Sequence, residues 1–288
     1  MTRLSDYDAS QPCEALVKAN HRITPPDVPE VRSLLLTIAH PDFSYREGQH
    51  VGVAVPGSKA FGHDRHFRLY TIANSPQPAE SGAVDIELCV RRCFYIDEVS
   101  GEEYPGLASN YLCDLKTGDR LTITGPYGDA FQIPENNDTN LLMIGSGTGI
   151  APFRAFIQHI YERQPEWHGQ VRLFYGARTG TENLYQNDQK NDLANYYDRE
   201  TFEAFEGLSH RPWMHHDDTG LGQLLEDNAE QIWALIQDPK THVYLAGLPK
   251  TAEDFFQSMK RVAGSAEQWH MTREAMIDAN RWSELLYS

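Results

Sequence analysis

A glycine-rich segment at residues 141–153 restricts the fold of this chain more than any other feature. The apolar run LLMI leads into Gly145, Gly147 and Gly149, and Pro152 follows shortly afterwards. Glycine tolerates positive φ angles and lets backbone N–H groups approach a ligand, whereas proline suits the first turn of a helix. The segment therefore predicts a strand, a tight turn and a helix whose N-terminus binds an anion such as a pyrophosphate.

The spacing of this turn departs from the usual GxGxxG dinucleotide fingerprint, because Ile150 occupies the position of the third glycine. An ordinary strand-to-helix turn is the alternative interpretation. Three glycines in register with Thr148 and the proline favour nucleotide binding.

The pattern of apolar residues changes near residue 137. Before it, short β-rich runs separated by turn residues predict an antiparallel barrel or sandwich. After it, strands alternate with helical patterns, which predicts a parallel sheet with crossover connections. A length of 288 residues also suits two domains. We expect an N-terminal all-β antiparallel β-barrel, residues 1–137, and a C-terminal α/β parallel-sheet domain, residues 138–288.

Charge and composition exclude several classes of function. The net charge of −16 opposes binding to nucleic acid. The first residues lack the apolar core of a signal peptide and no apolar run approaches the roughly 20 residues that cross a bilayer, so we expect a cytoplasmic protein without an integral membrane segment. The four cysteines show no cluster-binding spacing, and the adjacent side chains of residues 215–218 (HHDD) are more typical of an exposed loop than of a metal site.

The segment RLYTIANS, residues 68–75, combines a guanidinium, a phenol and a hydroxyl on one predicted strand. Arg68 and Tyr70 share one face of that strand, and Leu69 and Thr71 share the other. An arginine can clamp a phosphate and a tyrosine can cover a flat ring. A partly exposed strand is the alternative.

Two further segments of the first half suit an anion. LCVRR, residues 88–92, carries cations on a strand, and ASNYLCDL, residues 108–115, predicts a short helix capped by Ser109 with a free N-terminus. An exposed charged strand and a capped helix are the ordinary interpretations. They do not explain why these segments occur together with RLYTIANS.

These segments, with GPYG (residues 125–128), GSGTGIAPFRAF, YLAGL and the terminal aromatic residues, resemble plant-type ferredoxin–NADP(H) reductases. The motifs occur in the family's order and cover residues from about 31 to 288. The resemblance implies an enzyme with FAD in the first domain and NADP(H) in the second. Such a flavoprotein transfers electrons between NADPH and a one-electron carrier such as ferredoxin or flavodoxin.

The resemblance also implies roles for residues of the first half. Arg68 would contact the FAD pyrophosphate, Tyr70 would cover the isoalloxazine, and Thr71, in place of a serine, would lie near the flavin N5. Tyr95 would stack on the adenine, and Ser109 would bind a phosphate. The FAD-binding residues implied by the resemblance are Arg68, Leu69, Tyr70, Thr71, Cys89, Arg91, Tyr95, Ala108, Ser109 and Tyr287, of which Thr71 and Tyr287 would take part in catalysis.

The C-terminal segment resembles the family's end, where a tyrosine stacks on the flavin until the nicotinamide displaces it. Tyr287 matches that tyrosine, although Ser288 follows it and a frayed terminus is the alternative. Ala246 and Asn280 replace a cysteine and a glutamate that align the nicotinamide or relay protons in the family. We expect these changes to slow the reaction without abolishing it.

The dinucleotide-binding residues implied by the resemblance are Gly145, Gly147, Thr148, Gly149, Pro152, Arg178, Ser209, Arg211, Gly247 and Leu248. Ser209 and Arg211 lie one position out of register with the family's S-R-E motif for the 2′-phosphate. The resemblance still favours NADPH over NADH, whereas a solvated surface arginine is the alternative.

Three alternatives stay open. The reductase component of an oxygenase system would need the same flavin site. A flavin- or nucleotide-binding sensor with little turnover is suggested by Ala246 and Asn280, and a pure interaction scaffold would bind no flavin. Docking of an acidic carrier would need local cations, and the candidates are Lys18, Lys59, Arg65 and Arg92. No feature of the sequence indicates an oligomeric state.

Overall fold

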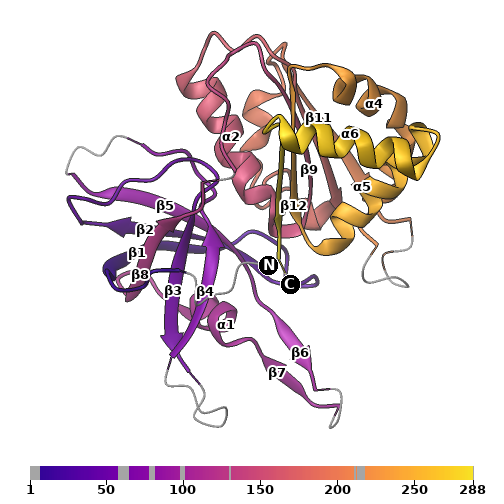
Figure 1. Cartoon of the computed structure of the whole chain (residues 1–288). Coiled ribbons are helices and arrows are strands. Elements are labelled where there is room, and N and C mark those ends of the chain that lie inside the picture. The colour runs from indigo at the N-terminus through magenta and orange to yellow at the C-terminus, as the bar shows by residue number, and fades with distance from the viewer. Residues whose placement is uncertain are drawn as a thin grey trace. The chain divides into compact units, whose positions relative to one another are not determined.

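The computed structural model describes residues 7–57, 65–77, 82–97, 101–129, 131–210, 212 and 218–287. The chain divides into two compact units, Met1–Asp129 and Ala130–Ser288 (Figure 1). Phe131 belongs to the second unit, where its ring packs against Phe153, Phe156 and Tyr244.

The first unit is built on a six-stranded antiparallel sheet with the strand order β4-β3-β8-β1-β2-β5. The strands are β1 (Cys13–Arg22), β2 (Val31–Ile38), β3 (His50–Pro56), β4 (Arg65–Thr71), β5 (Val84–Arg91) and β8 (Arg120–Tyr127). The two end strands meet through a bridge between Ile72 and Leu88 and a hydrogen bond of 2.7 Å from Ala73 N to Glu87 O. The sheet therefore closes, which confirms the expected antiparallel barrel.

Alternating side chains of these strands fill the barrel. Leu34, Leu36 and Ile38 of β2 are completely buried, as the period of two in a strand requires. Helix α1 (Leu107–Asp114) adds Leu112 to the same core. The hairpin of β6 (Phe94–Ile96) and β7 (Glu103–Pro105) lies outside this core and exposes its side chains.

The second unit contains a parallel sheet with the order β11-β10-β9-β12-β13, which confirms the predicted α/β class. The strands are β9 (Asn140–Ser146), β10 (Val171–Ala177), β11 (Phe202–Leu208), β12 (Thr241–Gly247) and β13 (Trp282–Leu286). The α-helices are α2 (Ile150–Arg163), α3 (Leu221–Asp227), α4 (Ala229–Gln237), α5 (Pro249–Val262) and α6 (Ala266–Asp278). Short 3₁₀ turns are η3 (Gly147–Gly149), η4 (Gly180–Glu182) and η5 (Leu193–Tyr196).

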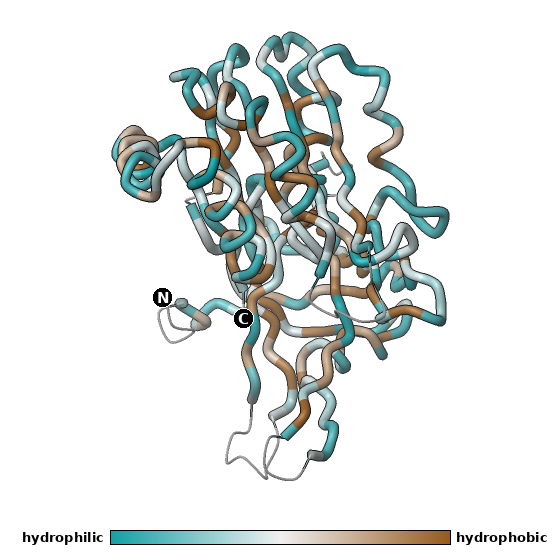
Figure 2. The backbone as a smooth tube through the Cα atoms, turned by 90° about the vertical axis from the view of Figure 1, so that its right-hand side faces the viewer, coloured by the Kyte–Doolittle hydropathy of each residue, from teal (hydrophilic) through white to brown (hydrophobic). Residues whose placement is uncertain are grey.

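Helices cover both faces of the parallel sheet. Leu142 and Leu245 pack in one cluster with residues of α3 to α6, whereas the ring of Tyr244, on the opposite face, lies 5.2 Å from that of Phe156 in α2. Hydrophobic residues (brown in Figure 2) alternate with hydrophilic ones along the helices. Burial on both faces explains why β9 is apolar along most of its length.

The strand order places β9 between β10 and β12, where the order of connections reverses. Ligands of such sheets bind beyond the carboxyl ends of the strands at this point. The glycine-rich turn follows β9 directly and therefore lies at this edge. Within the described ranges, no helix has the length and apolar character needed to cross a bilayer.

Candidate functional site

The turn after β9 has the conformation predicted for an anion site. Gly147 has a φ of +54°, and a Cβ built on it would meet no atom within 4 Å. The positive φ, rather than crowding, therefore favours glycine there. A Cβ on Gly149 would collide with the carbonyl of Ala246, so the turn lies directly against β12. Pro152 is the third residue of α2, in the first turn, where an N–H has no partner within the helix.

A buried tyrosine fixes the direction of this turn. The hydroxyl of Tyr175, in β10, donates a hydrogen bond of 2.8 Å to the carbonyl of Gly147, which also accepts from Ile150 N. In a planar trans peptide, the N–H of Thr148 points opposite to that carbonyl. The Thr148 N–H is therefore directed out of the helix N-terminus, where an anion is stabilised by the free donors and the helix dipole.

Other predicted residues of the second unit lie at the same edge of the sheet. Gly247 ends β12, and the exposed Leu248 follows it. The backbone N–H of Tyr287 donates to Gly247 O over 3.0 Å, and Ser146 and Thr251 share a hydrogen bond of 2.8 Å between their hydroxyls. The structure thus brings the glycine turn, the end of β12 and the backbone of Tyr287 together.

Two residues predicted to bind the dinucleotide, Ser209 at the 2′-phosphate and Arg178 at the pyrophosphate, have acidic neighbours. Ser209 follows β11, and its hydroxyl donates to Asp218 Oδ2 over 2.7 Å. The guanidinium of Arg178 donates from Nε to Glu182 Oε1 over 2.9 Å. Each carboxylate opposes the binding of a second anion at its site. Arg211 lies outside the described residues, as do residues 213–217 with most of the HHDD segment.

The backbone conformation at residue 280 favours asparagine over the glutamate expected from the family pattern. It follows α6 with a φ of +55°, its N–H donates to Ile277 O, and the N–H of Arg281 donates to Met276 O. These two hydrogen bonds define a Schellman motif, whose left-handed residue is usually Gly or Asn. Ala246 is completely buried in β12, beside Gly145 of β9. These two departures from the family pattern therefore fit the local packing.

In the first unit, β4 presents the predicted flavin residues. Arg68 is exposed, and its Nε donates to His66 Nε2 over 3.2 Å. Tyr70 is half-buried against the barrel core, and burial raises the pKa of its phenol well above the ordinary value. Oγ1 of Thr71 forms a 3.0 Å hydrogen bond with Nδ1 of His50, for which the sequence predicts no role in the site.

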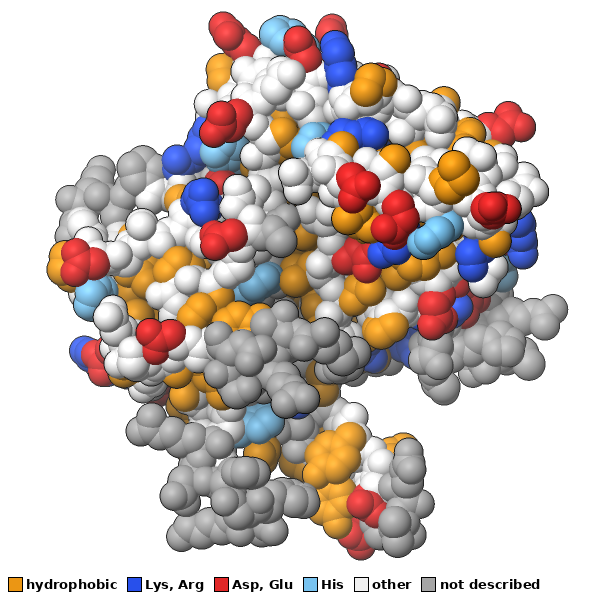
Figure 3. Space-filling view, in the orientation of Figure 1, with side chains coloured by type: hydrophobic (Ala, Val, Ile, Leu, Met, Phe, Trp, Pro, Cys, Tyr) orange, Lys and Arg blue, Asp and Glu red, His pale blue; other side chains and the backbone are white. Residues whose placement is uncertain are grey.

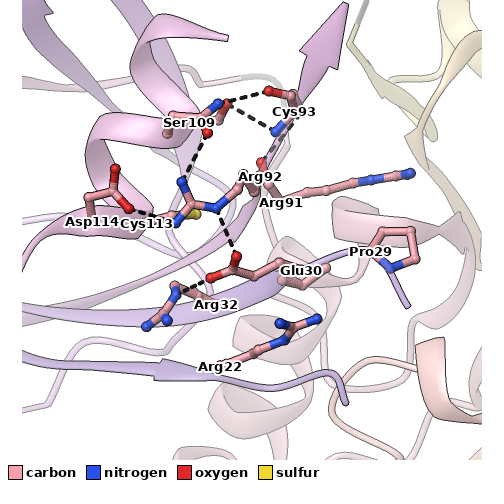
Figure 4. A network of polar contacts seen from close by, with 12 residues as sticks. Arg22, Pro29, Glu30, Arg32, Arg91, Arg92, Cys93, Ser109, Cys113 and Asp114 are labelled. Atoms are coloured by element: carbon pink, nitrogen blue, oxygen red, sulfur yellow. Dashed lines mark hydrogen bonds and ion pairs between the residues drawn. The ribbon is translucent and has the colours of Figure 1, made fainter. Parts of the chain in front are cut away.

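The helix α1 begins earlier than predicted. Its N-cap is Gly106, and Ser109 is the third helical residue rather than the cap. The Ser109 hydroxyl accepts a hydrogen bond from Cys93 N at 3.2 Å (Figure 4). It donates to Gly106 O at 3.3 Å. The expected cap is therefore wrong, because the hydroxyl joins the start of the helix to Cys93, which lies between β5 and β6. The first-turn N–H groups still have no partner within the helix and remain suited to an anion.

Two adjacent arginines at the end of β5 have different environments. Arg92 donates to Glu30, Asn110 and Asp114 at 2.8, 2.9 and 2.8 Å, and Glu30 also pairs with Arg32 at 2.5 Å. Partial burial works to raise the pKa of Glu30, but the hydrogen bonds from Arg92 and Arg32 outweigh it and hold the pKa below its ordinary value.

Arg91 is exposed and points away from this network (Figure 4). Of the two, only Arg91 is therefore placed to meet a ligand. Arg92, a candidate for carrier docking, is held within the barrel unit by its three partners.

The β6–β7 hairpin carries the tyrosine predicted to bind adenine. Tyr95 is 45% exposed and stacks on Tyr104, with 5.5 Å between ring centroids and 21° between planes. Because one ring face meets Tyr104, the other is left to contact a flat ring. Hydrophobic side chains gather over this hairpin in Figure 3.

The other predicted FAD residues contribute little side-chain surface. Cys89 and Ala108 are buried, and Ala108 belongs to the barrel core. Leu69 is half-buried on β4, opposite Gly52. Their side chains therefore offer little surface to a ligand.

The donor set of the first unit fits a dinucleotide with a pyrophosphate. The guanidinium groups of Arg68 and Arg91 are exposed, and the α1 N-terminus adds backbone donors. No group of three metal-ligating side chains gathers anywhere in the part of the chain that the structure describes.

Comparisons with known proteins agree with this division of roles. The model of the oxidoreductase FAD-binding domain matches residues 27–131, and that of the oxidoreductase NAD-binding domain matches residues 143–257. Ferredoxin–NADP reductase of Spirulina sp. is 33% identical over 259 residues, which are 88% of this chain and 87% of the relative. The Synechocystis enzyme is 32% identical over 88% of this chain and 62% of its own length.

A leaf-type chloroplastic ferredoxin–NADP reductase of Nicotiana tabacum is 29% identical over 93% of this chain and 75% of its own length. Among solved structures, ferredoxin–NADP⁺ reductase from Plasmodium falciparum superposes with a TM-score of 0.75 at 20% identity, covering 98% of both chains. This structural likeness confirms the fold.

Proposed function

Because this chain belongs to the ferredoxin–NADP reductase family, we propose that it is an FAD-dependent oxidoreductase that transfers electrons between NADPH and ferredoxin. The observation that carries the proposal is the match of an FAD-binding and an NAD-binding oxidoreductase model to the barrel and the parallel sheet. Bound FAD would supply the exchange between two-electron nicotinamide chemistry and one-electron carrier chemistry.

The first unit supplies the groups that would hold FAD. Arg68, Arg91 and the α1 N-terminus would neutralise the pyrophosphate, because their donors are exposed and cationic or dipolar. Tyr70 would cover the isoalloxazine, and Tyr95, supported by Tyr104, would stack on the adenine.

The second unit supplies the groups that would hold the nicotinamide dinucleotide. The turn at Gly147 and Thr148 would bind the pyrophosphate with its outward N–H groups. The preference for NADPH rests on the family and on Arg211, since the Asp218 carboxylate beside Ser209 works against a 2′-phosphate. The stacking of Tyr287 on the flavin stays a prediction.

Ferredoxin is the carrier that the family favours. The chain is acidic, with a net charge of −16, so an acidic carrier needs local cations for docking. Lys18 is exposed but pairs with Asp85 at 2.7 Å, whereas Lys59 and the Arg65 side chain lie outside the described residues. Flavodoxin, an oxygenase component and a cytoplasmic location stay predictions.

The proposal is tested by measuring NADPH oxidation and carrier reduction by the FAD-loaded protein. We expect NADPH oxidation to depend on ferredoxin, and Arg68→Leu to lose both FAD and activity. Arg120→Leu is the matched control, because Arg120 is an exposed barrel arginine that pairs with Glu14. Failure to reduce any one-electron carrier, with FAD retained, would overturn the reductase assignment in favour of a sensor.

A further inference from the structure

His50 and Thr71 form a side-chain pair across the barrel sheet. The two residues are direct partners in the antiparallel pairing of β3 and β4. Nδ1 of His50 lies 3.0 Å from Oγ1 of Thr71, a hydrogen-bonding distance. The hydroxyl predicted to lie near the flavin N5 therefore has a protein partner within hydrogen-bonding distance.

The GPYG turn makes room for the His50 ring. A Cβ built on Gly128 would lie 3.1 Å from Cδ2 and 3.2 Å from Nε2 of the imidazole, and Gly128 has a φ of +91°. A residue with a side chain at this position would crowd the ring and strain the backbone. Gly128 thus leaves the imidazole in the orientation that directs Nδ1 to Thr71.

The imidazole is neutral at physiological pH. Burial lowers the pKa of His50 from its ordinary value of 6.5 to about 4. A neutral imidazole carries one proton, on either Nδ1 or Nε2. If Nδ1 is protonated, it donates to Thr71 and leaves the hydroxyl proton available. If Nε2 is protonated, the hydroxyl must donate its proton to Nδ1.

We infer that His50 is a positioning residue whose Nδ1–H donates to Thr71 Oγ1 and so directs the Thr71 hydroxyl proton toward a ring nitrogen of the bound flavin. The inference rests on the proposed function, since an unprotonated ring nitrogen accepts hydrogen bonds and a hydroxyl facing it must donate. His50 thereby determines that the Thr71 hydroxyl donates toward the cofactor, without itself touching the cofactor.

The tautomer of His50 is measured directly by nitrogen NMR of protein labelled with ¹⁵N-histidine and loaded with FAD. The His50 signals are identified by their loss in His50→Asn. We expect Nδ1 to be protonated and Nε2 to be unprotonated in the FAD-bound protein. Protonation at Nε2 alone would overturn the inference.

The flavin absorption spectrum provides a second, independent measurement. Thr71→Val removes the hydroxyl, so we expect a shift of the visible flavin band and FAD binding weakened by roughly three- to tenfold. His50→Leu should shift the band in the same direction, and His50→Leu combined with Thr71→Val should shift it no further. Additive shifts would show that His50 acts independently of Thr71 and would contradict the inference.

Two variants separate positioning from folding and from the proposed function. His50→Asn keeps an N–H donor near the Nδ1 position, so it should restore most of the spectrum lost in His50→Leu. His40→Leu is the control, because His40 is an exposed histidine of the same unit and should leave the flavin band unchanged. If the unaltered protein binds no FAD, the proposed function fails, whereas an Nε2 tautomer with FAD bound rejects only the role of His50.

Discussion

The hydroxyl of Tyr175 donates to the carbonyl of Gly147 across 2.8 Å, so a buried side chain of β10 sets the direction of the turn that follows β9. This contact orients the Thr148 amide toward the side where a pyrophosphate would bind. We therefore expect the affinity for a dinucleotide to depend on Tyr175, even though this residue need not touch the ligand.

Tyr175→Phe removes this hydrogen bond while keeping the ring. We expect the dissociation constant for NADP⁺ to rise by roughly three- to tenfold, because the turn loses a constraint on its donors. Isothermal titration calorimetry measures the change. Tyr244→Phe is the matched control, since Tyr244 is also buried but donates to Gln132 O, outside the glycine turn. Equal losses in both variants would contradict the role of Tyr175.

Arg91 and Arg92 are adjacent, yet we expect opposite phenotypes. Arg92→Leu leaves Glu30 partly buried with one partner fewer, so the free energy of unfolding should fall by about 3 kcal/mol. Arg91→Leu should barely affect stability but should weaken FAD binding. Urea denaturation and FAD titration of both variants measure the two effects. A stable Arg92→Leu protein with impaired FAD binding would reverse the assignment.

Composition and strand periodicity do not separate these two arginines, and only the family resemblance assigns Arg91, rather than Arg92, to FAD. Both lie at the end of the same apolar strand, and neither local composition nor spacing tells which side chain turns inward. The difference arises because the pairing of β2 with β5 brings Glu30 to Arg92, a contact between residues distant in the chain. Hydrophobic alternation predicted the barrel, but it does not identify partners for charged residues at the ends of strands.

Contacts between residues distant in the chain also limited what could be predicted for Tyr175 and Ser109. The glycine turn and the parallel sheet were predictable, because local backbone chemistry and residue periodicity determine them. Tyr175 carries no such signal, since its partner is a backbone carbonyl in the turn that follows the neighbouring strand β9. Serine is a residue type that often caps helices, which is why the sequence predicts Ser109 as the cap of α1. The helix instead starts at Leu107, and its residue Leu112 packs in the barrel core.

We expect the Asp218 carboxylate to weaken the preference for NADPH over NADH. Asp218→Asn removes a negative charge that accepts the Ser209 hydroxyl, so binding of NADP⁺ should tighten by roughly tenfold with little change for NAD⁺. Calorimetric titration with both dinucleotides gives the ratio. Asp227→Asn, an exposed residue at the end of α3, controls for the change in net charge. An unchanged ratio would place the 2′-phosphate away from Ser209.

His50 should make the barrel unit less stable in mild acid. Its pKa is about 4 in the folded protein and 6.5 ordinarily, so only the unfolded chain takes up this proton as the pH falls below 6.5. The contribution of neutral His50 to the free energy of unfolding is therefore fully present above pH 6.5 and is lost progressively as the pH falls toward 4.

Between about pH 7 and about pH 5 the loss amounts to about 2 kcal/mol. Urea denaturation at the two pH values should show this decrease in the unaltered protein and in His40→Asn, but a smaller one in His50→Asn. Identical pH dependence in all three proteins would mean that His50 titrates normally when folded.

The most direct test of the flavoprotein assignment is an anaerobic absorbance titration of the purified, FAD-reconstituted protein with NADPH and with NADH. We predict a yellow protein whose visible flavin band is bleached by NADPH at lower concentrations than by NADH and returns when oxidised ferredoxin is added. A protein that cannot be reconstituted with FAD, or whose flavin band is unaffected by either dinucleotide, would contradict the assignment.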